Sequence, residues 1–146
     1  MSRRSATAAW LIRVVVAAVF AWAGTQKARQ PVLFALDLEA YRLLPAAVIL
    51  PIAYYLPWLE ILTAFALFLP PLRRAAGWLV IVLLAVFTTM LVVAWARGLQ
   101  INCGCFGTAG RAPTDFVIAI FRNLALLGAA IWLARRPPVR LAIPAG

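Results

Sequence analysis

Long apolar runs, separated by short groups of polar residues, dominate the pattern along the chain. A helix that crosses the core of a bilayer needs about 20 mostly apolar residues. Segments long enough for such a helix lie at 6–24, within 43–72, at 75–96 and at 116–134. Since backbone groups in hydrocarbon must satisfy their own hydrogen bonds, each segment predicts a membrane-spanning helix.

The few polar residues inside these runs distinguish them from one another. The first run contains Arg13 as its one charged residue, and the fourth contains Arg122. The second run carries Glu60, and Pro51 and Pro57 are expected to interrupt it. The third run has no charged residue, which makes it the clearest of the four.

The connections between the runs differ in character. Residues 26–44 form an amphipathic segment, expected along the membrane interface as a short helix. The tight connection at Arg73 and Arg74 predicts that the second and third helices form an antiparallel hairpin. The expected fold is an all-α membrane protein, a bundle of four transmembrane helices with an interfacial segment between helices 1 and 2. Residues 1–136 would form this single domain, and residues 137–146 an exposed tail.

Composition supports lipid as the main solvent of this chain. Only 12% of the 146 residues are charged, against about 25% in soluble domains. The net charge of +10 suggests nucleic acid at first, but the basic residues stand singly or in pairs at the ends of apolar runs. That pattern is typical of membrane anchoring, so the expected partners include membrane lipid and no nucleic acid. The absence of histidine excludes His-ligated haem, His-containing zinc sites and Ser-His-Asp hydrolases.

The first run also resembles a cleaved signal peptide, with Arg3 and Arg4 before it and Ala21-Trp22-Ala23 near its end. Arg13 would interrupt the apolar region of such a peptide and Trp22 makes a poor cleavage site, so a retained span is expected.

The basic residues in the short loops predict the orientation in the inner membrane. With the N-terminus inside, the cytoplasmic side would carry eight of them: Arg3, Arg4, Arg13, Arg73, Arg74, Arg135, Arg136 and Arg140. The outer side would carry five: Lys27, Arg29, Arg42, Arg97 and Arg111. The excess places both termini in the cytoplasm and the loop before the fourth helix outside, in an oxidising compartment.

That loop holds both cysteines of the chain, Cys103 and Cys105, on either side of Gly104. A disulfide across one residue closes a very small ring, restricts the unfolded chain little and strains the bond geometry. Strained, exposed disulfides are the labile ones, so the pair favours redox exchange over a structural bridge. Lys27, Arg97 and Arg111 stand near the same face and could stabilise a thiolate, although interfacial anchoring explains Arg97 and Arg111 better.

Polar residues inside the spans form the second group of candidates. Charged groups within a membrane usually face the bundle interior and pair with one another. By sign, Glu60 and Arg122 are the expected partners, with Asn123 beside them. Their depths agree if the second span starts near Ile52, but not if it starts near Leu44. One interpretation is that these residues only hold two helices together. The other is that they form a polar layer beneath the dithiol, where they adjust the pKa values of the thiols or relay a proton. Nearby, Tyr54, Tyr55 and Trp58 are aromatic-wall candidates, or else ordinary interface residues.

Several local patterns coincide along the chain. They are Phe20-Ala21-Trp22-Ala23-Gly24-Thr25-Gln26-Lys27, Tyr41-Arg42-Leu43-Leu44-Pro45, Leu56-Pro57-Trp58-Leu59-Glu60, Asn102-Cys103-Gly104-Cys105-Phe106-Gly107 and Arg122-Asn123. Together they resemble the MauE branch of the DoxX-like membrane proteins, over nearly the whole chain. The resemblance implies a four-helix membrane protein linked to extracytoplasmic thiol-disulfide exchange, often with a thioredoxin-like partner. It makes Cys103 and Cys105 the redox pair and puts Lys27, Glu60, Arg122 and Asn123 at family-like polar positions.

The expected activity is therefore thiol-disulfide exchange with an extracytoplasmic thioredoxin-like protein. The dithiol would pass electrons either to an external acceptor or to a membrane quinone, with Trp58, Tyr54 and Phe106 as candidates for lining its site. Two alternatives stay open: a carrier of a soft metal, copper(I) or mercury(II), which thiolates select, and a non-enzymatic scaffold of a redox complex. No metal site is assigned within the bundle.

Overall fold

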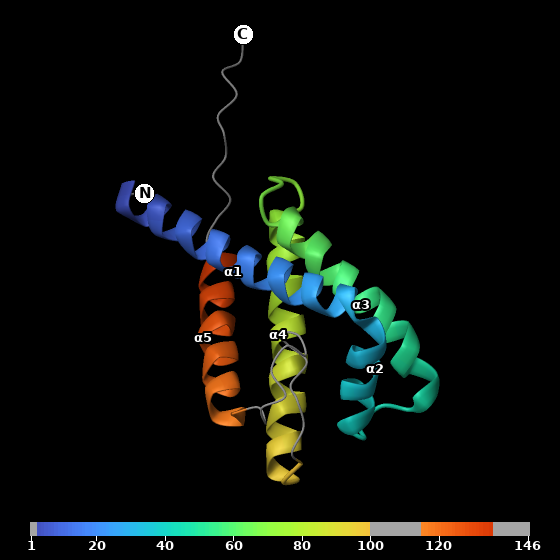
Figure 1. The fold of residues 1–146 in the computed structure, drawn as a ribbon. Helices are drawn as coiled ribbons and strands as arrows, with labels where there is room; N and C mark the ends of the chain where they lie inside the picture. Colours follow the sequence, from blue (N-terminus) through green and yellow to red (C-terminus); the bar gives the residue numbers. More distant parts are fainter. Residues whose placement is uncertain (1–2, 100–114, 136–146) are drawn as a thin grey trace.

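The computed structural model describes residues 3–99 and 115–135, and all of its regular elements there are helices (Figure 1). They are α1 (Arg3–Arg29), α2 (Pro31–Ala40), α3 (Ala46–Ala66), α4 (Arg73–Ala96) and α5 (Phe116–Ala134). Four of them, α1, α3, α4 and α5, are long and apolar enough to cross a membrane. The predicted all-α fold with four membrane-length helices is confirmed.

The predicted boundaries agree at some ends and fail at others. Helix α5 covers the predicted segment, whereas α1 continues past residue 24 to Arg29. Residues 25–29 contain neither glycine nor proline, so nothing in them stops the helix. Pro31 then begins α2, at a position where its missing N–H costs no hydrogen bond. Lys27, expected in a loop, therefore belongs to the end of α1.

Helix α3 is continuous through Pro51 and Pro57, so the predicted interruption is wrong. Each proline removes one backbone hydrogen bond from the helix. Membrane helices tolerate this loss because neighbouring helices and local adjustments satisfy the freed groups. Pro57 is fully buried where α1 crosses α3, which gives it such a neighbour.

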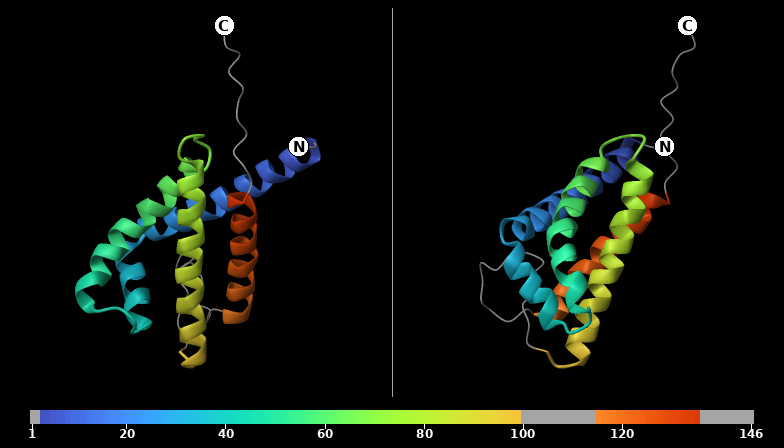
Figure 2. Two further views of the ribbon diagram at one scale, coloured as in Figure 1. Left: turned by 180° about the vertical axis from the view of Figure 1, so that it is seen from behind. Right: turned by 90° about the vertical axis from the view of Figure 1, so that its right-hand side faces the viewer.

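The helices form two packed pairs (Figures 1 and 2). Helix α1 slants across the molecule and packs mainly on α3, while α4 and α5 lie side by side. The short helix α2, which forms within the predicted amphipathic segment, lies beside α3. Helices α3 and α4 are antiparallel across the short turn at 67–72, but each packs more closely on another helix.

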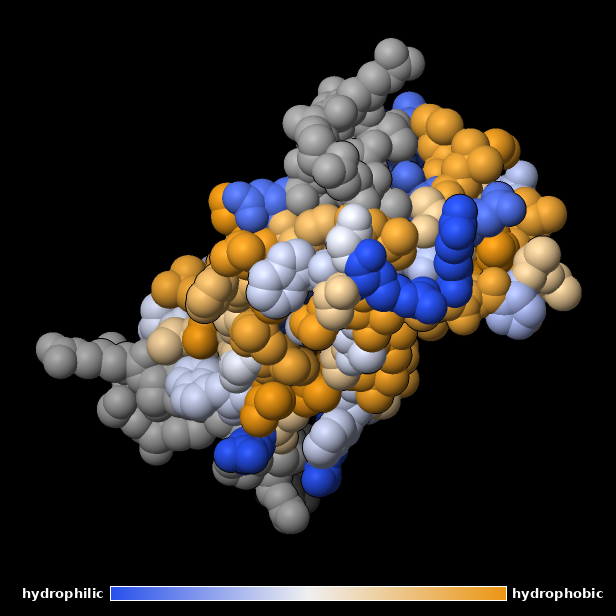
Figure 3. All heavy atoms as spheres, turned by 90° about the horizontal axis from the view of Figure 1, so that it is seen from below, coloured by the Kyte–Doolittle hydropathy of each residue, from blue (hydrophilic) through white to orange (hydrophobic). Residues whose placement is uncertain are grey.

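The core lies where the two pairs meet. Its centre is built from Val16 and Phe20 of α1, Ala64 of α3, and Val80 and Leu84 of α4. The face seen in Figure 3 is mostly hydrophobic, with hydrophilic side chains in a few groups. Hydroxyl groups inside the helices donate to the carbonyl four residues earlier, as Thr63 does to Leu59 at 2.6 Å. Because these bonds form within the helix, the hydroxyl groups need no hydrogen-bond partner from the surrounding lipid.

The two ends of the bundle differ in charge. Among the described residues at the end with the α3–α4 turn, the charged groups are basic: Arg73, Arg74 and Arg135. At the opposite end the charges are mixed: Asp115 caps α5, α2 descends there with Asp37 and Glu39, and Arg42 and Arg97 follow the ends of α2 and α4.

Candidate functional site

A buried ion pair joins α1 to α3. The Nζ of Lys27 donates to Oε1 of Glu60 at 2.6 Å. Lys27 is 3% exposed and Glu60 is 2% exposed, so the pair is shielded from solvent within the described structure. A lone buried charge would be very costly, and each of these groups compensates the other.

Two aromatic rings complete the surroundings of the Lys27 ammonium. Its Nζ lies 4.5 Å from the centroid of the Phe87 ring in α4 and 5.3 Å from that of Phe34 in α2. Both distances suit a cation–π interaction, which strengthens when the cation is desolvated. Lys27 is also the only lysine in the chain. Helices α1, α2, α3 and α4 thus all contribute to holding this single ammonium group.

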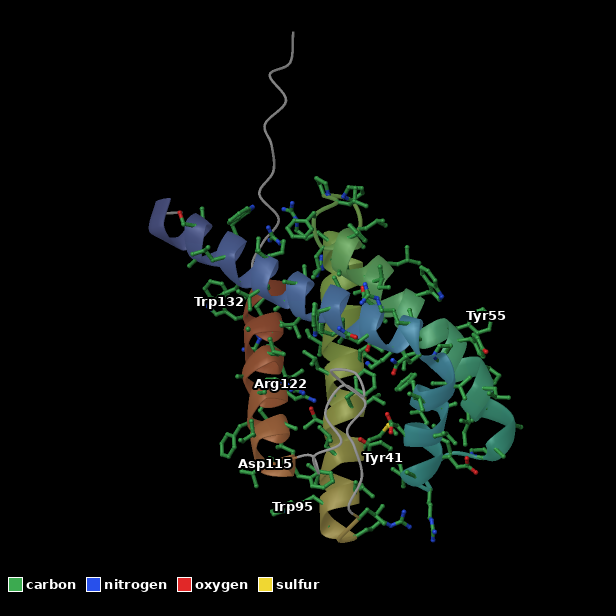
Figure 4. All side chains as sticks on the ribbon, in the orientation of Figure 1. Tyr41, Tyr55, Trp95, Asp115, Arg122 and Trp132 are labelled. Carbon is green, nitrogen blue, oxygen red and sulfur yellow. The ribbon has the colours of Figure 1, made fainter. Side chains whose placement is uncertain are left out.

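Helix α5 brings a second polar pair to the same place. Nη2 of Arg122 donates to Oδ1 of the neighbouring Asn123 at 3.4 Å, and Asn123 is 4% exposed. Arg122 extends from α5 toward the interior of the bundle (Figure 4).

The two pairs line one cavity of about 30 Å³ between α1, α3, α4 and α5. Its wall is formed by Val19, Phe20, Ala23, Lys27, Glu60, Leu84, Phe87, Arg122, Asn123 and Leu126. The structure therefore brings together all four polar residues that the sequence singled out, from three different helices. A cluster of four polar side chains within an otherwise apolar bundle is the candidate functional site.

The expected Glu60–Arg122 ion pair is wrong. Among the described residues the ion pair of Glu60 is with Lys27, while Arg122 shares the cavity with it. The sequence pattern predicted Lys27 in a loop outside the bundle, which left Arg122 as the available cation. The continuation of α1 carries Lys27 inward instead.

The predicted aromatic lining does not reach this cavity. Tyr54 is 52% exposed and Trp58 is 60% exposed, both on the outer face of α3. Tyr55, which projects away from the bundle in Figure 4, is 77% exposed. These side chains have the exposure expected of residues that meet lipid. The rings that do approach the polar cluster, Phe34 and Phe87, carried no distinguishing sequence signal; spacing alone could not have selected them.

The two cysteines, Phe106 and Arg111 lie outside the described residues. The helix ends that flank them are described: α4 ends near Arg97, which is exposed, and α5 begins after Asp115. Oδ1 of Asp115 accepts hydrogen bonds from the backbone N–H groups of Val117 and Ile118 at 3.1 and 3.3 Å. Arg122 follows Phe116 by six residues, roughly 9 Å along the helix axis. The polar cluster is thus within two helical turns of the end where the cysteine loop joins α5.

The size of the cavity limits what it holds. Its volume of about 30 Å³ is well below that of an apolar cavity of about 150 Å³ that binds benzene. Among the described residues there is also no group of three or more cysteine, aspartate or glutamate side chains that could hold a metal ion. The cluster suits water, protons and charge compensation.

A charged centre inside membrane-length helices defines the class of protein: a helical integral membrane protein with a buried polar site. The chain belongs to the family of methylamine utilisation protein MauE, whose family model matches residues 5–136. This confirms the resemblance inferred from the motifs. Family and helices together indicate a multi-pass membrane protein.

Similar proteins come from several bacteria. Methylamine utilization protein MauE of Methylophilus methylotrophus is 35% identical over 136 residues, covering 90% of this chain and 70% of that protein. The protein of the same name from Paracoccus denitrificans is 32% identical over 137 residues, covering 93% and 72%. That of Methylorubrum extorquens is 32% identical over 129 residues, covering 88% and 69%. No solved structure matches the chain.

Proposed function

We propose that this protein is a membrane thiol-disulfide oxidoreductase that serves methylamine utilisation by exchanging disulfides with an extracytoplasmic thioredoxin-like protein. The reactive pair is Cys103 and Cys105. The name of the relatives supports the physiological setting. The observation that carries the chemistry is the buried cluster of Lys27, Glu60, Arg122 and Asn123, close to the helix end from which the cysteine loop departs.

The exchange follows ordinary thiol chemistry. A thiolate of the reduced partner attacks one sulfur of the Cys103–Cys105 disulfide and forms a mixed disulfide, releasing the other cysteine as a thiolate. The second thiol of the partner then attacks the mixed bond. Two electrons and two protons pass from the partner dithiol to this chain, and the partner leaves oxidised. A strained ring across Gly104 favours this direction, since strained disulfides are the stronger oxidants.

The dithiol must then be reoxidised. An acceptor, either a membrane quinone or an external disulfide, takes two electrons and two protons from Cys103 and Cys105. A quinone would have to bind outside the 30 Å³ cavity. The orientation proposed for this cycle places both termini in the cytoplasm and the cysteine loop outside, following the distribution of basic residues.

Single cysteine variants test the exchange. In cells, Cys103→Ser or Cys105→Ser should accumulate a mixed disulfide with one extracytoplasmic protein, because the remaining thiolate can attack the disulfide of the oxidised partner while this chain lacks the second thiol that completes the exchange. The adduct should vanish on reduction and be absent from the Cys103→Ser/Cys105→Ser double variant. If neither single variant forms an adduct and both keep full activity, thiol exchange is ruled out and the scaffold alternative stands.

Two further measurements separate the remaining alternatives. A soft-metal carrier is identified if its thiols resist alkylation only when copper(I) or mercury(II) is added, and if no mixed-disulfide adduct with a partner forms. For quinone, the purified reduced protein is mixed with a soluble quinone and the absorbance of the quinone is followed. If the absorbance of the quinone does not change while an external disulfide is reduced at a normal rate, the acceptor lies outside the membrane.

A further inference from the structure

The polar cavity contains an oxygen whose hydrogen-bonding capacity is unused. Glu60 gives Oε1 to Lys27, but Oε2 is buried and has no hydrogen-bond partner among the described residues. Leaving a buried acceptor unsatisfied costs about 1–3 kcal/mol, and more if it is charged. Glu60 is 2% exposed and lines the cavity, so the cavity offers space for a partner of Oε2.

The cavity has the volume and the polar groups that internal water requires. One water needs at least about 10–15 Å³ of such space and two to four polar partners. The volume of about 30 Å³ accommodates one or two. A water there can donate to Oε2 of Glu60 and accept from the guanidinium of Arg122 or the amide of Asn123, which line the same wall.

We propose that this cavity is an internal hydration site, in which one or two water molecules join Glu60 of α3 to Arg122 and Asn123 of α5. Through these waters the Lys27–Glu60 pair exchanges its protons with solvent, although both side chains are almost completely buried. Each event replaces one proton of the Lys27 ammonium by one from water, so the charge of the site does not change. The proposal needs neither cysteine and goes beyond the thiol chemistry proposed above.

The composition of the chain makes the site unusually accessible to spectroscopy. Lys27 is the only lysine, and Glu39 is the only glutamate besides Glu60. Nitrogen-15 in lysine therefore reports on Lys27 alone. Carbon-13 in the glutamate carboxyl groups of a Glu39→Gln protein reports on Glu60 alone.

The test uses the full chain in lipid nanodiscs and measures magnetisation transfer from water to these two labels. Water contact at Glu60 and solvent exchange at Lys27 are expected in the Glu39→Gln protein and equally in its Cys103→Ser/Cys105→Ser derivative. Ala23→Val adds two methyl groups to the cavity wall and should abolish the water contact. Ala125→Val, on the exposed side of α5, is the matched control and should leave it unchanged.

Either of two results overturns the proposal. One is a Glu60 carboxyl group without water contact in the Glu39→Gln protein, a measurement that does not depend on any cavity variant folding. The other is a contact that survives in folded Ala23→Val, since the water would then lie outside the cavity. Because the cysteine-free protein is measured in parallel, failure here is distinguishable from failure of thiol exchange.

Discussion

Gly24 of α1 lies directly against the backbone of Pro57 in α3. A Cβ at position 24 would be 2.7 Å from the carbonyl oxygen of Pro57 and 2.8 Å from Cγ1 of Ile61. No real side chain fits at these distances, so the approach of α1 to α3 requires glycine here. Lys27 follows three residues later, on the same side of α1, and this close contact brings it within reach of Glu60.

Replacing this glycine should therefore loosen the helix pair. Gly24→Ala is expected to destabilise the protein by about 1–3 kcal/mol, the usual cost of overpacking. Gly128→Ala in α5 is the matched control, because nothing lies within 4 Å of its added Cβ. Unfolding in mixed detergent micelles measures both free energies, and an equal effect of the two substitutions would contradict the close contact.

Breaking the ion pair from one side should be more damaging than removing it altogether. Lys27→Met or Glu60→Leu alone leaves a buried charge without its partner, at an expected cost of about 3–5 kcal/mol. The double variant replaces both charges by apolar groups and should recover most of that loss. A double-mutant cycle of unfolding free energies measures the coupling, and additive losses would show that the pair does not act as a unit.

Asp37 should make stability depend on pH. Burial raises the pKa of this half-buried carboxyl group in α2 from 3.8 to about 6, because desolvation disfavours the charged form. A raised pKa means that the folded state binds the proton more tightly than the unfolded state. The stabilising contribution is therefore complete below pH 3.8 and is lost as the pH rises through about 6.

Thermal unfolding between these pH values checks the assignment. The wild-type midpoint should fall as the pH rises, and Asp37→Asn should remove that part of the dependence. Glu39→Gln, at an exposed position two residues along the same helix, should keep it. A pH dependence unchanged by Asp37→Asn would place its origin elsewhere.

The start of α5 should depend on the cap at Asp115. Asp115→Ala removes the acceptor for the N–H groups of Val117 and Ile118 and should cost about 1 kcal/mol. Asp115→Asn keeps an acceptor oxygen and should cost much less. Hydrogen exchange of the first-turn amides of α5 reports the effect, and equal protection in both variants would show that the cap is not needed.

The sequence was sufficient for the helices because length and hydropathy decide what can cross a bilayer. Phe116–Ala134 was predicted to the residue. Pro51 and Pro57 misled the prediction of α3, because a rule that holds in water is relaxed where neighbouring helices satisfy the backbone.

The sequence singled out the four residues of the polar cluster but did not predict which of them form the ion pair. Lys27, Glu60, Arg122 and Asn123 stand out as polar groups at the margins or within apolar runs. Which of the two cations meets Glu60 depends on where α1 ends and on its slant across α3. Those properties arise from tertiary contacts such as Gly24 on Pro57, which hydropathy does not encode.

The unequal charge of the two bundle ends also has an electrical consequence. The described charges at the α3–α4 end are arginines, whereas at the other end Asp37, Glu39 and Asp115 offset Arg42 and Arg97. Moving one elementary charge through a membrane potential of 100 mV is worth about 2.3 kcal/mol. In a respiring cell, whose interior is negative, such a voltage therefore favours the proposed orientation, which keeps Arg73 and Arg74 on the cytoplasmic side.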